Sequence, residues 1–141
     1  MRSRFPGLSL GLLAALTLAA HADDDPQKAP EHKITQSKSY LSLDPIYATI
    51  VDDDRAQGML MVGVGLDVPD PTLRAVANRS LPVLRDAYVR NLMAFTAASV
   101  RTTSQPDVSE IAERLQGVTD RALGQKGAKI LLAQVALRVL H

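Results

Sequence analysis

The residues that most often carry catalysis or bind metals are rare in this sequence. The three histidines, His21, His32 and His141, fall near the start of the chain or at its last position. General acid–base catalysis needs an imidazole held within hydrogen-bond reach of its partner, and none of the three has a rigid element to hold it. The chain has no cysteine, which excludes a thiol nucleophile and a thiolate metal site. We therefore predict a protein that is not an enzyme and that needs no cofactor or metal.

Two short motifs resemble binding sites but have the wrong spacing. Asp52-Asp53-Asp54 lacks the ligand spacing and the closing glutamate of a calcium loop, so we interpret it as a solvated turn. Gly63-Val64-Gly65 lacks the third glycine of a dinucleotide-binding fingerprint and falls inside a predicted strand. Two glycines on one strand face allow another backbone to approach closely. We expect a helix of the same chain to pack against them, with a second subunit as the alternative.

The adjacent charges Arg85 and Asp86 are the most suggestive polar pair in the central region. Neighbouring residues do not face each other on a helix, so these two side chains are expected to have different partners. Exposure to solvent is the simpler interpretation. The sequence thus offers four candidates for contact with a partner protein: Arg85, Asp86, Gly63 and Gly65.

The first 22 residues have the layout of a secretory signal peptide. Arg2 and Arg4 form a basic start, residues 7–20 are apolar, and Ala20-His21-Ala22 has the form of a cleavage site. The apolar run of about 14 residues is shorter than the roughly 20 that a membrane-spanning helix needs. This favours cleavage, while a retained membrane anchor stays open as the alternative. In both cases we expect the rest of the chain to lie outside the cytoplasm.

The charge and size of the remaining chain limit the classes of partner that it can bind and the number of domains that it can form. Without residues 1–22 it has fourteen basic and fifteen acidic residues, so no basic excess remains to bind nucleic acid. Contact with a membrane then depends on whether the leader is cut. Residues 23–39 are polar, contain two prolines and are typical of a flexible tether. Residues 40–141 are predicted to form one domain with an aliphatic core.

Apolar periodicity predicts three strands. The first two, at 43–51 and 59–68, are joined by a polar connector at 52–58 and form an antiparallel hairpin. In the second strand, alternation predicts two faces, one of which is made of Leu60, Val62, Val64, Leu66 and Val68. In the third strand, 129–140, alternation predicts another shared face: Leu131, Ala133, Val135, Leu137 and Val139.

Helical spacing of apolar residues predicts two helices between the hairpin and the last strand. The first covers 71–98, with Asp70 as its cap. Pro82 inside this pattern predicts a kink or break near 80–82, with Ser80 as a cap for the second half. The second helix follows a cap at Asp107 and ends at Gly124. The fold class is α+β: a three-stranded antiparallel sheet, made of the hairpin and the C-terminal strand, with a kinked long helix and a second helix on one face.

From Tyr40 onward the chain resembles the periplasmic domain of FliL, the flagellar basal-body-associated protein. Four segments carry the likeness: YLSLDP at 40–45, GMLMVGVGL at 58–66, LPVLRD at 81–86 and ILLAQV at 130–135. The resemblance rests on the order of the elements and on the Arg-Asp step at Arg85 and Asp86. The short apolar run at the N-terminus departs from the family, whose members typically keep one membrane-spanning helix.

This resemblance implies a fold similar to the stomatin-like periplasmic domain of FliL. It also implies a non-enzymatic role in flagellum-dependent motility, in which the protein associates with stator units and basal-body proteins and forms a homo-oligomer. Arg85 and Asp86 are the only residues whose match carries over. The alternative function is a periplasmic carrier or binding module for a small ligand, unrelated to flagella. That alternative needs an apolar pocket between the helices and the sheet.

Overall fold

The computed structural model of the protein describes residues 36–140. The predicted leader and its cleavage site, most of the predicted tether and the last residue lie outside this range. The elements, in chain order, are β1 (Tyr40–Ser42), β2 (Ile46–Asp52), β3 (Arg55–Asp67), α1 (Pro71–Arg79), α2 (Leu81–Ser99), α3 (Val108–Leu123) and β4 (Lys129–Val139). Within the described range, no helix has both the length and the apolar character that a membrane span requires.

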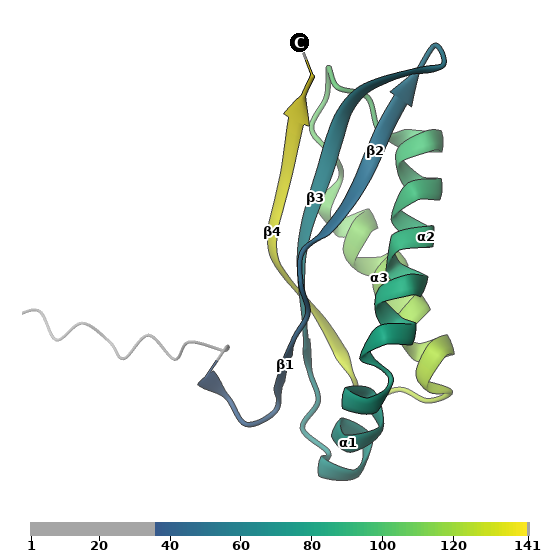
Figure 1. Ribbon diagram of the computed structural model, residues 1–141. Helices are drawn as coiled ribbons and strands as arrows, with labels where there is room; N and C mark the ends of the chain where they lie inside the picture. The colour runs from purple at the N-terminus through teal and green to yellow at the C-terminus, as the bar shows by residue number, and fades with distance from the viewer. Residues whose placement is uncertain (1–35, 141) are drawn as a thin grey trace, which may run out of the picture. The chain divides into compact units, whose positions relative to one another are not determined.

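The sheet is antiparallel and is built around β3, its longest strand (Figure 1). One edge of β3 pairs with β4, and the other pairs with β2 and then with the short β1. The α+β class and the antiparallel sheet are confirmed, but the number of strands is four and not three. The predicted strand at 43–51 begins only at Ile46, because Pro45 has no N–H to give to a strand ladder. A separate strand, β1, precedes this break.

The connection between β2 and β3 is tighter than predicted. Asp53 and Asp54 both have positive φ angles, of 48° and 58°, as a two-residue type I′ hairpin turn requires. Aspartate tolerates this left-handed backbone better than most side chains. The polar connector predicted at 52–58 is therefore wrong, since β3 already begins at Arg55. The aspartates at 52–54 are exposed, in agreement with a solvated turn.

The helices begin and end near the predicted residues. The side chain of Asp70 accepts a hydrogen bond from the backbone N–H of Thr72, at 3.0 Å, and caps α1. The predicted break is confirmed, since α1 and α2 separate at Ser80. Ser80 occupies the predicted N-cap position of α2, and its carbonyl oxygen accepts from the N–H of Leu84, but its side chain makes no cap bond. Asp107 caps α3, and Gly124 ends it with a φ of 69°.

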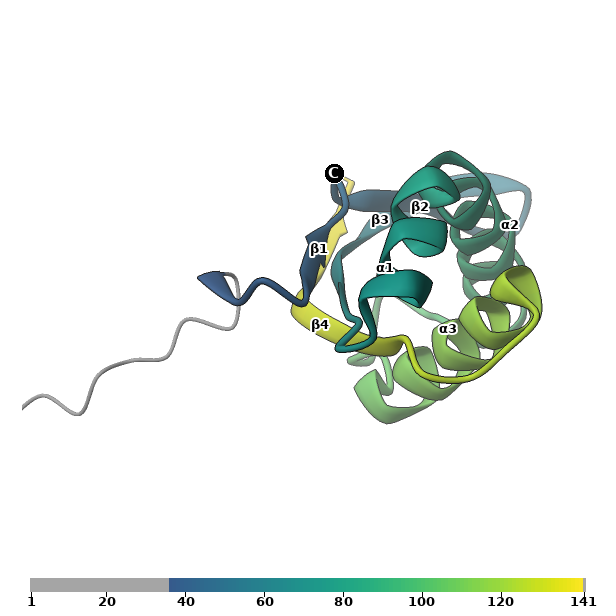
Figure 2. The same cartoon turned by 90° about the horizontal axis from the view of Figure 1, so that it is seen from below.

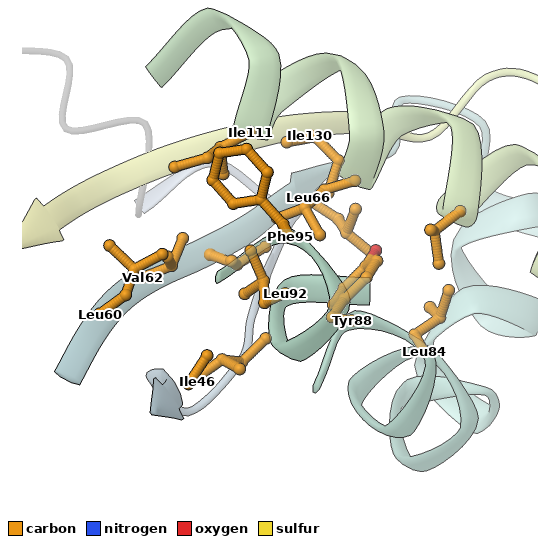
Figure 3. Packing of buried hydrophobic residues seen from close by; sticks show 14 of the residues in the cluster. Ile46, Leu60, Val62, Leu66, Leu84, Tyr88, Leu92, Phe95, Ile111 and Ile130 are labelled. Atoms are coloured by element: carbon orange, nitrogen blue, oxygen red, sulfur yellow. The ribbon is translucent and has the colours of Figure 1, made fainter. Parts of the chain in front are cut away.

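All three helices lie on one side of the sheet (Figure 2). Side chains from α2 and α3 meet the inner face of β2, β3 and β4 in a single aliphatic core (Figure 3). The predicted alternation along β3 is confirmed, because the five residues assigned to one face, from Leu60 to Val68, are at most 2% exposed and form its inner side. The largest fully buried side chains of the helices are Leu84, Tyr88, Leu92, Ile111 and Leu115.

The face predicted to be shared along β4 is wrong in its first half. A β-bulge interrupts the β3–β4 pairing between Gly63 and Val64, and Ala133 is the extra residue. A bulge shifts the alternation by one residue, so the faces before and after it no longer match a simple period of two. The register places the following residues of β4 opposite the inner residues of β3: Ile130, Leu132, Val135 and Leu137. Leu131 therefore faces away from the helices.

Candidate partner-binding surface

The predicted contact residue Arg85 has an internal role. Its Nη1 atom donates a hydrogen bond to the carbonyl oxygen of Asp44, at 2.9 Å, and lies 3.5 Å from that of Pro45. These two carbonyls belong to the break between β1 and β2, outside the strand ladder. Arg85 thus ties the first turn of α2 to the interrupted edge of the sheet.

Asp86 points elsewhere, as expected for adjacent helical residues. Its Oδ2 atom lies 2.8 Å from Nη2 of Arg90, one turn further along α2. The two side chains are 59% and 71% exposed, so water screens the pair and its contribution to stability is small. Of the Arg-Asp step, only Asp86 is therefore exposed for contact with another molecule.

Gly63 and Gly65 lie on the face of β3 that points away from the helices. The predicted approach of a helix to these glycines is therefore wrong. Gly65 is covered instead by the ring of Tyr40 from β1, and an added Cβ atom would collide with that ring. At Gly63 the nearest atom to an added Cβ would be the backbone nitrogen of Gln134, at an ordinary 3.4 Å. A contact between subunits at Gly63 stays a prediction.

The glycines belong to a larger apolar surface, which we call the open sheet face. It is the side of the sheet that no described helix covers (Figure 2). The register brings Tyr47 of β2, Met61 of β3 and Ala136 of β4 side by side across it. The other members of this surface are Tyr40, Thr49, Met59, Gly63, Leu131 and Gln134.

The side chains of the open sheet face are of the kind that bind other proteins. Tyr47 is 53% exposed and offers an apolar ring with a polar tip. Met59 and Met61 are half-buried and can adjust their shape to an irregular surface. Charged side chains occur at its two ends, with Arg138 beside Met59 and Lys129 beside Asp67. The centre is thus apolar and the ends are charged.

The sequence of β3 itself carries a signal for this surface. The alternation along β3 places Met59 and Met61 on the side opposite the core residues, yet these side chains are also apolar. A strand that is apolar on both faces, in a sheet with helices on only one face, leaves one face for another molecule. The fold must be known before one can conclude that this face stays uncovered, because the conclusion depends on how many helices there are and on which side they pack.

The helices also contact the two outer edges of the sheet. Thr96 of α2 donates its hydroxyl to the carbonyl oxygen of Thr49 in β2, at 2.9 Å. Gln116 of α3 donates from Nε2 to the carbonyl oxygen of Ala128, at 2.8 Å, and its Oε1 accepts from the N–H of Ile130, at 2.9 Å. The amide of Gln116 therefore replaces a neighbouring strand at the start of β4.

A buried pair of hydroxyls joins α2 to α3. The hydroxyl oxygens of Tyr88 and Thr119 are 2.6 Å apart, and Thr119 donates its proton to the carbonyl oxygen of Leu115. Tyr88 must therefore be the donor to Thr119. Burial raises the pKa of Tyr88 above its ordinary value of 10.0; the hydrogen bond to Thr119 opposes this shift, and the nearby charge of Asp120 adds to it.

A hollow opens beside the second half of β4. It is lined by the loop at residues 102–106, which joins α2 to α3, and by Val108, Val135 and Leu137. Val135 and Leu137 point to the core side of the sheet but remain half-buried, so the helices do not fully cover this end of β4. This hollow lies at the surface, whereas the space between the helices and the sheet is filled by core side chains.

Residues 36–140 hold no group of three histidine, cysteine, aspartate or glutamate side chains that could bind a metal ion. The three histidines lie outside this range. No protein-family model matches the chain, and no curated protein matches it. The resemblance to FliL therefore rests on the quoted residues and on the order of the elements.

Proposed function

We propose that this protein is a non-enzymatic accessory of the bacterial flagellum, with a fold similar to the stomatin-like periplasmic domain of FliL. It acts in the periplasm, associates with stator and basal-body proteins, and assembles with copies of itself. The order of strands and helices supports this proposal, together with the segments at 40–45, 58–66, 81–86 and 130–135 that resemble FliL. The open sheet face is the surface through which it binds the basal body.

The observation that carries this assignment is the apolar centre of the open sheet face. Tyrosine and methionine are enriched in protein–protein interfaces, and charged residues are depleted from their centres. Tyr47 and Met61 follow this composition at the centre, and Arg138, beside Met59, and Lys129, beside Asp67, are at the ends of the surface. Charges at the rim of an interface select the partner more than they add affinity. A surface of this kind suits binding and assembly.

Deleting the gene in the source bacterium tests the proposal. We expect smaller swimming zones in soft agar, restored by the wild-type gene supplied in trans. The variant Tyr47→Glu places a charge at the centre of the open sheet face and should fail to restore swimming at a normal protein level. Val83→Glu on α2 is the matched control, because Val83 is 60% exposed on the helical side. Unchanged swimming in the deletion strain would contradict the proposed function.

The expected location has its own test. The N-terminus of the mature protein is measured by mass spectrometry after export. A chain that begins at Asp23 has lost its leader and reaches its partner in the periplasm. A chain that begins at Met1 keeps a membrane anchor, as FliL proteins typically do.

The space between the helices and the sheet is filled by core side chains, so the second candidate, a carrier for a small ligand, depends on the hollow beside β4. Ligand sites combine apolar walls with a few polar groups. Val135 and Leu137 supply apolar atoms here, and Thr102, Thr103 and Ser104 supply hydroxyls. Release of a small molecule from the protein purified out of its own periplasm, detected by mass spectrometry after denaturation, would support this candidate. Protein that releases nothing would count against it.

A further inference from the structure

The two outer edges of the sheet differ in the hydrogen-bond partners of their backbone N–H and C=O groups. Edge strands carry unpaired N–H and C=O groups that can pair with another chain unless something covers or interrupts them. On the β1–β2 edge, Pro45 interrupts the strand, Arg85 bonds to Asp44, and Thr96 bonds to Thr49. This edge is closed to an added strand at several points.

The outer edge of β4 is protected only where it starts. Gln116 satisfies the backbone of Ala128 and Ile130. From 132 to 139, no described strand pairs with this edge, and β4 lies at the outer side of the sheet (Figure 1). This stretch has no proline and only one charged residue, Arg138. Apart from the bulge at Ala133 and the charge of Arg138, it has none of the usual features that prevent strand addition.

The residues of this edge are complementary to themselves when two copies run antiparallel. With Ala136 opposite itself on a two-fold axis, Gln134 of one copy faces Arg138 of the other, and Val135 faces Leu137. In this register, residues of the open sheet face in one copy lie beside residues of the open sheet face in the other copy. The reason is that alternate residues of a strand share a face. No two like charges face each other in this register. The side-chain amide oxygen of Gln134 can accept a hydrogen bond from Arg138 of the other copy. The small side chain of Ala136 lies on the axis.

The hollow beside β4 adds an independent reason for a neighbour at this edge. Val135 and Leu137 are half-buried there. In the antiparallel register, Val135 and Leu137 of the second copy come to lie next to them on the same side of the sheet. The added strand thus covers apolar surface that the helices leave partly exposed.

We propose that the outer edge of β4, at residues 132–139, pairs with the same edge of a second copy of this chain. The pairing is antiparallel about a two-fold axis at Ala136, and it joins the two sheets and their open faces into one. A head-to-tail arrangement would need the β1–β2 edge, which α2 closes. This inference rests on the self-assembly part of the proposed function and is independent of its flagellar setting.

Cysteine cross-linking tests the pairing directly, because the natural chain has no cysteine. The full chain carrying Ala136→Cys is exported by a bacterial host and treated with an oxidant or a short bismaleimide. Residues directly opposite each other in an antiparallel pair bring their Cβ atoms to about 4.5–5.5 Å, so a covalent dimer is expected. Thr49→Cys is the matched control, since it lies on the same face but at the closed edge. Absence of a dimer with Ala136→Cys, or equal dimer with both variants, would overturn the proposal.

Charge changes at Gln134 test the register. Gln134→Glu places a carboxylate opposite Arg138 of the second copy, and Gln134→Arg places a like charge there. Each pair occurs twice by symmetry, so the dimer dissociation constants of the two variants should differ by roughly tenfold or more. Sedimentation equilibrium of the purified full chain measures both constants. Equal constants would overturn this register, and a monomer at every concentration would overturn the pairing.

The outcomes separate this inference from the proposed function. A monomeric protein that still supports swimming contradicts the β4 pairing alone. A deletion strain with normal swimming, whose protein nevertheless cross-links through Ala136→Cys, contradicts the flagellar role alone.

Discussion

Along the β1–β2 edge of the sheet, side chains of α2 bond to backbone carbonyls at two separate places, whereas along β4 a single glutamine of α3 covers only the first residues. The cause is the position of the helices. α2 packs more closely along β2 than α3 does along β4, and the hydrogen bonds from α3 reach only the first residues of β4. Helices that pack on one face of a sheet therefore also decide which of its edges remains available to another chain.

Deletion of the chain from Lys129 onward should have the largest effect on stability, because it removes the β4 edge of the sheet entirely. β3 would lose its longest pairing, and the core would lose Ile130, Leu132, Val135 and Leu137. We expect a chain with no cooperative thermal unfolding, since the loss approaches the about 5–15 kcal/mol of net stability of a typical domain. Circular dichroism during heating measures this. A cooperative transition in the truncated protein would contradict the prediction.

Thr96→Val tests how much the closed edge depends on α2. Valine keeps the shape of threonine but leaves the carbonyl oxygen of Thr49 without its hydroxyl partner. An unsatisfied polar group in a partly buried place costs about 1–3 kcal/mol, so the free energy of unfolding should fall by about 2 kcal/mol. Urea unfolding measures it. Thr49→Val is the control, because it makes the same change at an exposed side chain; an equal loss in both variants would argue against the bond.

Gln116→Leu removes the protection at the start of β4. The backbone groups of Ala128 and Ile130 lose their partners, but water reaches this partly buried place, so we expect a loss of about 1 kcal/mol in urea unfolding. With Ala136 on the two-fold axis, residues 128–130 lie beyond the paired stretch at 132–139, so the dimer dissociation constant should stay unchanged. Glu113→Leu, at an exposed position of the same helix, is the control. A weaker dimer in Gln116→Leu would speak against pairing through this edge.

Arg85→Ala and Arg90→Ala separate the two arginines of α2. Arg85 bonds to the break between β1 and β2, so its loss should cost about 0.5–1.5 kcal/mol. Arg90 only pairs with Asp86 at the exposed surface, so its loss should stay within about 0.5 kcal/mol. Thermal and urea unfolding of both variants provide the measurement. Equal effects would show that Arg85 does not hold the closed edge.

The smallest effect at neutral pH concerns Tyr88, which joins the helices that cover the two edges. Its pKa is raised in the folded protein, so the folded state holds the phenol proton more tightly than the unfolded state. The resulting stability is fully present below the ordinary pKa of 10.0 and is lost as the pH rises above it. Unfolding free energies measured from neutral to alkaline pH should fall at high pH, and less steeply in Tyr88→Phe. Parallel profiles would contradict this assignment.

Local patterns predicted much of the fold because they act over few residues. The caps at Asp70 and Asp107, the stop at Gly124 and the break before Pro82 each depend on one turn of backbone. The boundaries that failed depended on backbone angles at single positions. Asp53 and Asp54 take up a left-handed turn, and the bulge at Ala133 shifts the faces of β4.

The candidate site was less accessible to sequence analysis. Arg85 was recognised as unusual, but its partner carbonyl at Asp44 is more than forty positions away along the chain. Gly65 was recognised as a place of close approach, but the ring that covers it comes from Tyr40 of β1. In both cases the residue type signalled a contact, and its partner depended on which segments the fold brings together.

By itself, the sequence determined the α+β class, the alternation of side chains along β3, the helix limits and an inventory without cysteine, because these follow from composition and short-range periodicity. Only the tertiary structure decided which side of the sheet the helices cover and which edge they close. The physical reason is that a strand with apolar residues on both faces has two equivalent sides until the helices pack against one. The open sheet face and the free edge of β4 are what that packing leaves exposed.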